Sequence, residues 1–364
     1  EYRFAGNRLK LVPQLPEFSN AAGVLGFTEK GLDLRGGEAT FLGRPVRGSG
    51  LTEKDGTIRF LADGSLTAEG LNQIVPMRGR ERLKGETPVH ADIRAKSPFV
   101  EVRLGSSLQG MESTFPPPLR KAAGEEWPLN FVWRSENGKT GQSTQSWQLD
   151  LDRRLFLACE DRCAPGCGFT RGLLAYGTRI ELPAQGWRLA GEFGRLDLDP
   201  WKDVLGAFGK DEGLTREAKG LSAGVVFQAK EIVLAGHRFQ DVSGKALRQD
   251  GRWTLSLSGP QAEGNLVWVE EGRGMLSARL KHLVLDPLPV STSAQIVSAP
   301  GEESSGALTE LPALDVRAEN FRHRKLDLGR LQLSAVNTDK LWRLQKIGLD
   351  SPDFKLEASG QWRN

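Results

Sequence analysis

The sequence predicts an all-β protein composed mainly of antiparallel strands. Three observations support this: apolar and polar residues alternate along many short segments, turn-forming residues separate those segments, and helical periodicity is convincing in one place only. Successive side chains of a strand point to opposite faces of the sheet, so a period of two is typical of a strand with one dry and one wet face.

The alternation is clearest in six short segments, each with apolar residues at every second position: residues 32–35, 100–104, 147–152, 253–258, 331–334 and 354–358. Gly, Asp and Asn cluster between such segments, as in EKDG, ENGK and RQDG. These clusters are typical of the tight turns of β-hairpins. The chain also contains 43 Gly and 19 Pro, which is enough for many short connections.

One short amphipathic helix is expected over residues 199–209. Asp199 suits the N-cap, Pro200 suits the first helical position, and Gly209 suits the C-terminal stop. The residues between them form an apolar stripe at helical spacing, made of Trp201, Val204, Leu205 and Phe208.

The totals restrict the class of protein. A chain of 364 residues exceeds the roughly 250–300 residues at which a single core stops growing, so we expect several domains or an elongated fold. Its 49 Lys and Arg are interspersed with 46 Asp and Glu, which argues against a nucleic-acid partner. No apolar stretch approaches the roughly 20 residues that span a bilayer. The chain starts at Glu1, and both ends are expected to be cuts in a longer protein.

Two segments interrupt the strand pattern and suggest domain boundaries. The proline-rich residues 112–128 are expected to cross between two parts of the sheet, and residues 286–312, rich in Ser, Pro, Gly and Glu, are expected to form a flexible loop. The remaining parts are then an N-terminal sheet over 1–111, a central sheet over 129–285 and a C-terminal sheet over 313–364.

A weak internal repeat lies on the two sides of the second interruption. Residues 229–255 and 318–344 share an order of elements: a strand, a basic turn, a second strand, a polar turn and a third strand that begins with Trp. Repetition of this kind favours an array that grows in one direction over a closed globule.

The cysteines are few and close together. Cys159, Cys163 and Cys167 are spaced C-x3-C-x3-C, which differs from the usual zinc-binding pairs, and no His lies nearby. We therefore favour one candidate disulfide with a spare thiol, in an oxidising compartment, over a metal site. No order of Ser, His, Cys and Asp typical of a catalytic site is found, so we expect neither an enzyme nor a cofactor.

A sheet with one apolar face must cover that face. A second sheet would produce a β-sandwich, whereas one long sheet that curls lengthwise would line a trough with its own apolar face. Composition and periodicity leave both alternatives open.

Several stretches resemble the AsmA-like YhdP family of Gram-negative bacteria. They include a proline-rich stretch followed by WPL over 115–133, a strand and short helix over 194–208, a GxxFxDV opening with an SGPxxxGxLxW close over 235–268, and DLGRL and LxSPxxxLxASGxW pieces over 311–335 and 342–362. Together they are spread over most of the chain after residue 112. The first hundred residues fit the family by pattern only.

The resemblance implies a β-taco, a long curled antiparallel sheet that forms an open apolar groove. It also implies a periplasmic segment of a protein anchored in the inner membrane, which carries phospholipid toward the outer membrane as a passive, non-enzymatic conduit. Partners would be phospholipids, the inner and outer membranes at the ends of the full protein, and envelope proteins that the sequence does not identify. Candidate groove-lining residues are Leu255, Leu257, Leu266, Trp268, Leu331, Leu333 and Leu356.

A second hypothesis of a different class is a structural or interaction scaffold of β-sandwich modules in the cell envelope. It predicts closed cores and no bound lipid, so lipid content separates the two hypotheses.

Overall fold

The computed structural model describes most of the chain. The described residues are 1–10, 16–29, 31–74, 79–137, 143–161, 170–202, 204, 222–270, 274–286, 312–338 and 341–363. Strands account for nearly all of the secondary structure in these ranges, which confirms the all-β prediction.

The chain divides into two compact units. The first contains Glu1–Arg188 and Asp203–Asp211, and the second contains Leu189–Lys202 and Glu212–Asn364. The strands of the first unit are β1 (Tyr2–Leu9), β2 (Phe18–Thr28), β3 (Gly31–Phe41), β4 (Arg44–Thr52), β5 (Ile58–Thr67), β6 (Leu83–Lys96), β7 (Phe99–Ser106), β8 (Met111–Ser113), β9 (Leu129–Asn137), β10 (Ser143–Leu151), β11 (Leu155–Asp161) and β12 (Arg171–Tyr176).

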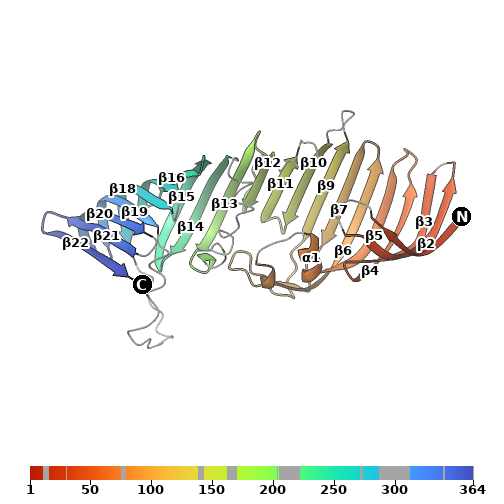
Figure 1. Cartoon of the computed structure of the whole chain (residues 1–364), viewed down its shortest axis with the longest axis horizontal. Helices are drawn as coiled ribbons and strands as arrows, with labels where there is room; N and C mark the ends of the chain where they lie inside the picture. The colour runs from red at the N-terminus through yellow and green to blue at the C-terminus, as the bar shows by residue number, and fades with distance from the viewer. Residues whose placement is uncertain are drawn as a thin grey trace. The chain divides into compact units, whose positions relative to one another are not determined.

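The first unit is an open antiparallel sheet in which strands that follow one another in the chain lie side by side (Figure 1). Each strand from β1 to β6 pairs with the next, β7 pairs with β9, and the ladder continues to β12. The short strand β8 pairs instead with the beginning of β6. The proline-rich segment 112–128 therefore connects two strands, β7 and β9, that are direct neighbours.

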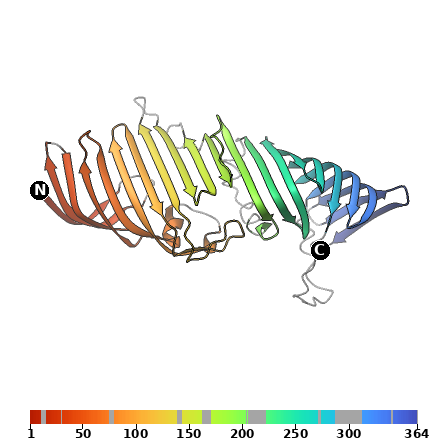
Figure 2. The ribbon, with the colours of Figure 1, turned by 180° about the vertical axis from the view of Figure 1, so that it is seen from behind.

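The second unit is also an open sheet, seen from the other side in Figure 2. Strand β13 (Gly186–Asp197) begins in the first unit and contributes most of its residues to the second. The other strands are β14 (Ala223–Leu234), β15 (His237–Gln249), β16 (Arg252–Ser258), β17 (Ala262–Val269), β18 (Met275–Leu285), β19 (Ala313–His323), β20 (Leu326–Thr338), β21 (Leu341–Asp350) and β22 (Lys355–Arg363).

One pairing corrects the expectation of a purely antiparallel sheet. Strands β18 and β19 are parallel, with Met275 opposite Ala313 and Leu285 opposite His323, whereas the other pairs from β14 to β22 are antiparallel. A parallel pair needs a connection long enough to return the chain to the starting end of the first strand. The segment 286–312 provides that length. The prediction that it is flexible falls on residues 287–311, which lie outside the described residues.

The helices differ from expectation in one respect. Helix α1 (Ala68–Ile74) was not predicted, and it begins where the Thr67 hydroxyl accepts a hydrogen bond from the backbone N–H of Gly70 at 3.0 Å. A threonine in this place is a usual N-cap, but a helix this short has too few residues for a periodic signal. Of the helix expected over 199–209, only residues up to Lys202 and Val204 are described.

In each unit the described strands form one open sheet rather than two stacked sheets. The predicted fold class, an all-β chain on an open, curled sheet, is therefore confirmed, and the β-sandwich interpretation is wrong for the described residues. Residues are buried in the second unit mainly by neighbours on the same face: Ala278, Leu280, Ala318 and Leu331 form a buried cluster against which Leu266, Leu283, Val316, Phe321, Ile347 and Leu349 pack.

Candidate functional site

An apolar face runs across the second unit from β14 to β22. Residues directly opposite one another on neighbouring strands share a face of the sheet. Following the register from strand to strand therefore traces one row, which consists of Val225, Ala246, Leu255, Leu266, Ala278, Val316, Leu333, Ile347 and Ala358. Every member is apolar.

A second row runs alongside the first on the same face. Its members are Phe227, Gly244, Leu257, Gly264, Leu280, Ala318, Leu331, Leu349 and Leu356. One of its two glycines makes room for a neighbouring side chain: a Cβ on Gly244 would lie 2.4 Å from the Phe227 ring. The Phe227 side chain on the adjacent strand therefore covers the place in the row where Gly244 has no side chain.

The predicted groove-lining residues all lie on this face. Leu255, Leu266 and Leu333 belong to the first row, Leu257, Leu331 and Leu356 belong to the second, and Trp268 lies opposite Trp253 beyond the first row. Their exposure differs across the sheet. Leu331 is only 8% exposed, whereas Leu356 on β22 is 45% exposed. That these residues line a groove for a ligand stays a prediction.

The opposite face of the second unit is polar. Ser256 donates a hydrogen bond to Asn265 at 2.8 Å, and Asn265 lies opposite Arg279 on β18. Arg279 in turn forms an ion pair with Asp315 at 2.5 Å. The two faces of this sheet thus differ as sharply as the alternation in the sequence predicts.

The first unit has the same division, and no groove-lining residue was predicted in it. Its apolar face contains a row traced by register partners: Leu34, Gly50, Phe60, Ile93, Val102, Trp133, Trp147, Cys159 and Gly172. The period-two pattern of residues 100–104 and 147–152 is the signal that would have included these positions.

Tryptophans face one another across neighbouring strands of both apolar faces. Trp133 lies opposite Trp147 in the first unit, and Trp253 lies opposite Trp268 in the second. Sequence reasoning missed these pairs, because a register between strands is not visible in the order of residues along one strand.

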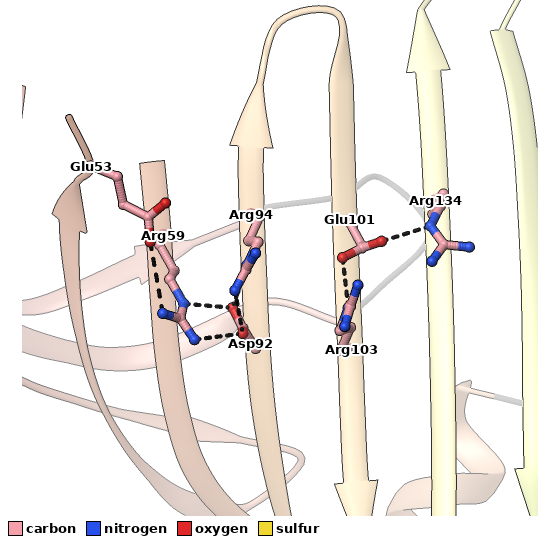
Figure 3. A network of polar contacts seen from close by, with 7 residues as sticks. All are labelled: Glu53, Arg59, Asp92, Arg94, Glu101, Arg103 and Arg134. Atoms are coloured by element: carbon pink, nitrogen blue, oxygen red, sulfur yellow. Dashed lines mark hydrogen bonds and ion pairs between the residues drawn. The ribbon is translucent and has the colours of Figure 1, made fainter. Parts of the chain in front are cut away.

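The polar face of the first unit contains two clusters of ion pairs (Figure 3). In one, Asp92 accepts hydrogen bonds from Arg59 at 2.8 and 3.1 Å and from Arg94 at 3.4 and 3.5 Å, and Arg59 also lies 3.7 Å from Glu53. The hydrogen bond from Arg59, followed by that from Arg94, holds the pKa of the Asp92 carboxyl below its usual range. These pairs link β5 to β6 and reach Glu53, the residue that follows β4.

In the second cluster, Glu101 on β7 accepts hydrogen bonds from Arg103 and Arg134, each at 2.6 Å. The hydrogen bond from Arg103, with a further one from Arg134, lowers the pKa of the Glu101 carboxyl. Cross-strand pairs of opposite charge stabilise a sheet, and here they connect β7 to β9. The carboxylates are thus occupied by arginines and are poorly suited to acid–base chemistry.

The structure describes one of the three cysteines of the predicted disulfide site. Cys159 carries a free thiol, is 4% exposed, and lies on the apolar face opposite Trp147 and Gly172. Burial raises the pKa of this thiol to about 11. Cys163 and Cys167 lie outside the described residues, so a bridge between them stays a prediction.

The side chains that could bind a metal ion or take part in catalysis are scattered over the described residues. Within the described ranges, no group of His, Cys, Asp and Glu side chains is arranged to hold a metal ion. His90 contacts Asp63 on the polar face, and His282 lies 3.0 Å from the Gly259 carbonyl oxygen. The first contact joins β5 to β6, and the second joins β18 to the turn that follows β16.

Comparison with known families agrees with the geometry of these two-faced sheets. The family model described as YhdP protein matches residues 1–364. The chain belongs to the YhdP family. No curated protein and no solved structure matches this YhdP-family chain. In the part of the chain that is described, no helix is both long and apolar enough to cross a membrane.

Membership of the YhdP family and an all-β sheet with a continuous apolar face fit a bridge-like lipid transport protein. The resemblance found in five stretches of the sequence extends, through the family model, to the first hundred residues, which by themselves fit only by pattern.

Proposed function

We propose that this YhdP-family chain binds phospholipid acyl chains along its apolar sheet faces and forms part of a passive conduit across the periplasm toward the outer membrane. The observation that carries the proposal is the pair of apolar rows that continues without a polar member from β14 to β22. With neighbouring strands about 4.8 Å apart, these rows extend for roughly 40 Å, about the length of two acyl chains end to end.

The driving force is the hydrophobic effect. Burial of an acyl chain contributes about 0.8 kcal/mol per methylene, and this contribution requires no specific hydrogen bond. A lipid can therefore move from one stretch of the apolar face to the next with little change in free energy, as a conduit requires. The proposal includes no chemical step, no cofactor and no metal.

The test is the lipid content of the purified chain, measured by native mass spectrometry before and after extraction with organic solvent. We expect several phospholipids per chain. The matched variants are Leu333→Asp on the apolar face and Gln332→Asp, one residue away on the polar face of β20. An unpaired carboxylate on a dry face is costly, so we expect Leu333→Asp to lose lipid and Gln332→Asp to retain it.

Leu356→Asp separates loss of binding from loss of folding. Leu356 is 45% exposed, so a charge there disturbs folding least among the predicted lining positions. A chain that melts cooperatively and contains no phospholipid would contradict the proposal and favour a structural role without lipid transport.

A further inference from the structure

The two edges of the apolar face in the second unit differ in chemistry. Strand β16 begins at Arg252, β17 ends at Val269, β18 begins at Met275 and β21 begins at Leu341. Because β16, β17 and β18 are antiparallel neighbours, β19 is parallel to β18, and β20 and β21 continue antiparallel, all of these strand ends lie along one edge. We call this edge the Trp rim and define it by the residues next to these strand ends that lie on or close against the apolar face: Arg248, Trp253, Trp268, Glu270 and Trp342.

Two indole N–H groups at the Trp rim donate hydrogen bonds to polar atoms. Trp253 Nε1 donates to Glu270 Oε1 at 2.9 Å, and Trp342 Nε1 donates to the Pro312 carbonyl oxygen at 3.1 Å. The Trp268 ring lies against the backbone of Gly274, where a Cβ would be 2.3 Å from it. Trp253 and Trp342 thus each combine an apolar ring with a hydrogen-bonded N–H at the edge of the sheet.

A charged pair belongs to the same edge. Arg248 lies opposite Trp253 on the apolar face and is only 8% exposed. Its Nε and Nη2 donate to the two oxygens of Glu270 at 3.1 and 2.9 Å. Glu270 therefore accepts hydrogen bonds from both Arg248 and Trp253, which places a paired positive and negative charge beside the apolar rows.

At the opposite edge of the same face, the side chains near the strand ends are apolar. Ile232 lies opposite Phe239 on β14 and β15, and Leu283 lies opposite Phe321 on β18 and β19. These side chains pack with the buried clusters of the sheet. His237 is the first residue of β15, and His323 is the last residue of β19. Across the face, polarity therefore increases toward the Trp rim.

We infer that the Trp rim is the edge over which phospholipid head groups emerge into water, while the acyl chains point toward the Ile232, Phe239, Leu283 and Phe321 edge. The inference rests on the proposed function. Trp is favoured where an apolar phase meets water, because its ring is apolar and its N–H requires a polar partner. Arg248 has the charge opposite to that of a lipid phosphate, and Glu270 has the charge opposite to that of the amine of a zwitterionic head group.

The experiment uses two phosphatidylethanolamine probes, one with a photoreactive diazirine on the head group and one with a diazirine in the middle of an acyl chain. Each is loaded onto the full chain and irradiated, and cross-linked peptides are mapped by mass spectrometry. We expect the head-group probe to label peptides that contain Trp253, Trp268 and Trp342. We expect the acyl probe to label peptides that contain Leu280, Leu283 and Phe321.

The two probes distinguish the inference from the function on which it rests. If the acyl probe labels the apolar face and the head-group probe labels the hairpins at 235–239 and 321–326 as much as the Trp rim, the inference is overturned and the proposed function stands. If neither probe labels the apolar face, the proposed function itself is overturned.

Matched variants sharpen the result. Trp268→Leu keeps the rim apolar and removes the indole, and Phe321→Leu makes a comparable change at the opposite edge. We expect Trp268→Leu to lower head-group labelling of the rim about threefold relative to acyl labelling of the face. We expect Phe321→Leu to leave the ratio of head-group labelling to acyl labelling unchanged. Equal effects of the two variants on head-group labelling would count against the inference.

Discussion

The Nε atom of Arg134 on β9 donates a 2.6 Å hydrogen bond to the Glu101 carboxylate on β7. These strands are separated in the chain by the proline-rich segment and by β8, which pairs elsewhere. The contact therefore ties together two strands that no short hairpin holds in register.

We expect Glu101→Gln to lower the free energy of unfolding by about 0.5–1 kcal/mol, because the arginines involved are about half exposed and water screens the lost ion pairs. Urea unfolding followed by circular dichroism at pH 7 measures this change. Glu136→Gln, on the same polar face of β9, is the control and should have little effect. Equal urea midpoints for the two variants would show that the ion pairs of Glu101 do not contribute measurably to stability.

Acid should destabilise the sheet of the first unit. The backbone N–H of Thr57, then the Thr57 hydroxyl and Lys96, lower the pKa of Asp55 to about 2. A carboxyl whose folded pKa lies below its unfolded value of about 4 stabilises the fold above that value, and the contribution is lost as the pH falls through the folded pKa. We therefore expect the thermal midpoint to drop between about pH 4 and about pH 2.

The matched variant for the acid prediction is Asp55→Asn, which removes the titrating carboxyl from the turn between β4 and β5. We expect its thermal midpoint to change less steeply over the same pH window than that of the unmodified chain. Identical slopes would show that Asp55 does not contribute to acid unfolding.

Cys159 should be unreactive in the folded chain. The thiolate is the reactive form, and burial both raises the pKa of this thiol to about 11 and blocks access to it. We expect iodoacetamide at pH 8 to leave Cys159 unmodified in buffer and to alkylate it fully in denaturant, as measured by peptide mapping. Rapid alkylation in buffer would mean that the apolar face around Trp147 is open.

Gly264 should tolerate no side chain. Its φ is +151°, and a Cβ would lie 2.2 Å from the Arg279 carbonyl oxygen. We expect Gly264→Ala to destabilise the second unit by about 1–3 kcal/mol. Gly105→Ala is the control, because a Cβ there meets no atom within 4 Å, and the change should stay within about 0.5 kcal/mol. Chemical denaturation of both variants compares them directly.

Much of the apolar face could be predicted from the sequence. Leu255 and Leu257, or Leu331 and Leu333, lie two residues apart, and strand geometry alone puts each pair on one side of a sheet. The repeat of residues 229–255 and 318–344 was also visible, and it corresponds to β14–β15–β16 and β19–β20–β21, with Trp253 and Trp342 each second in the third strand.

The order of residues by itself thus determined the fold class, the positions of most strands and which side chains share a face, because these depend on local periodicity. Only the tertiary structure decided that β18 and β19 run parallel, that Trp253 lies opposite Trp268, and that both lie along the same edge as Trp342. Such relationships depend on the register and direction of pairing between strands, and many registers satisfy the same alternation. Packing of whole strands against one another selects among them.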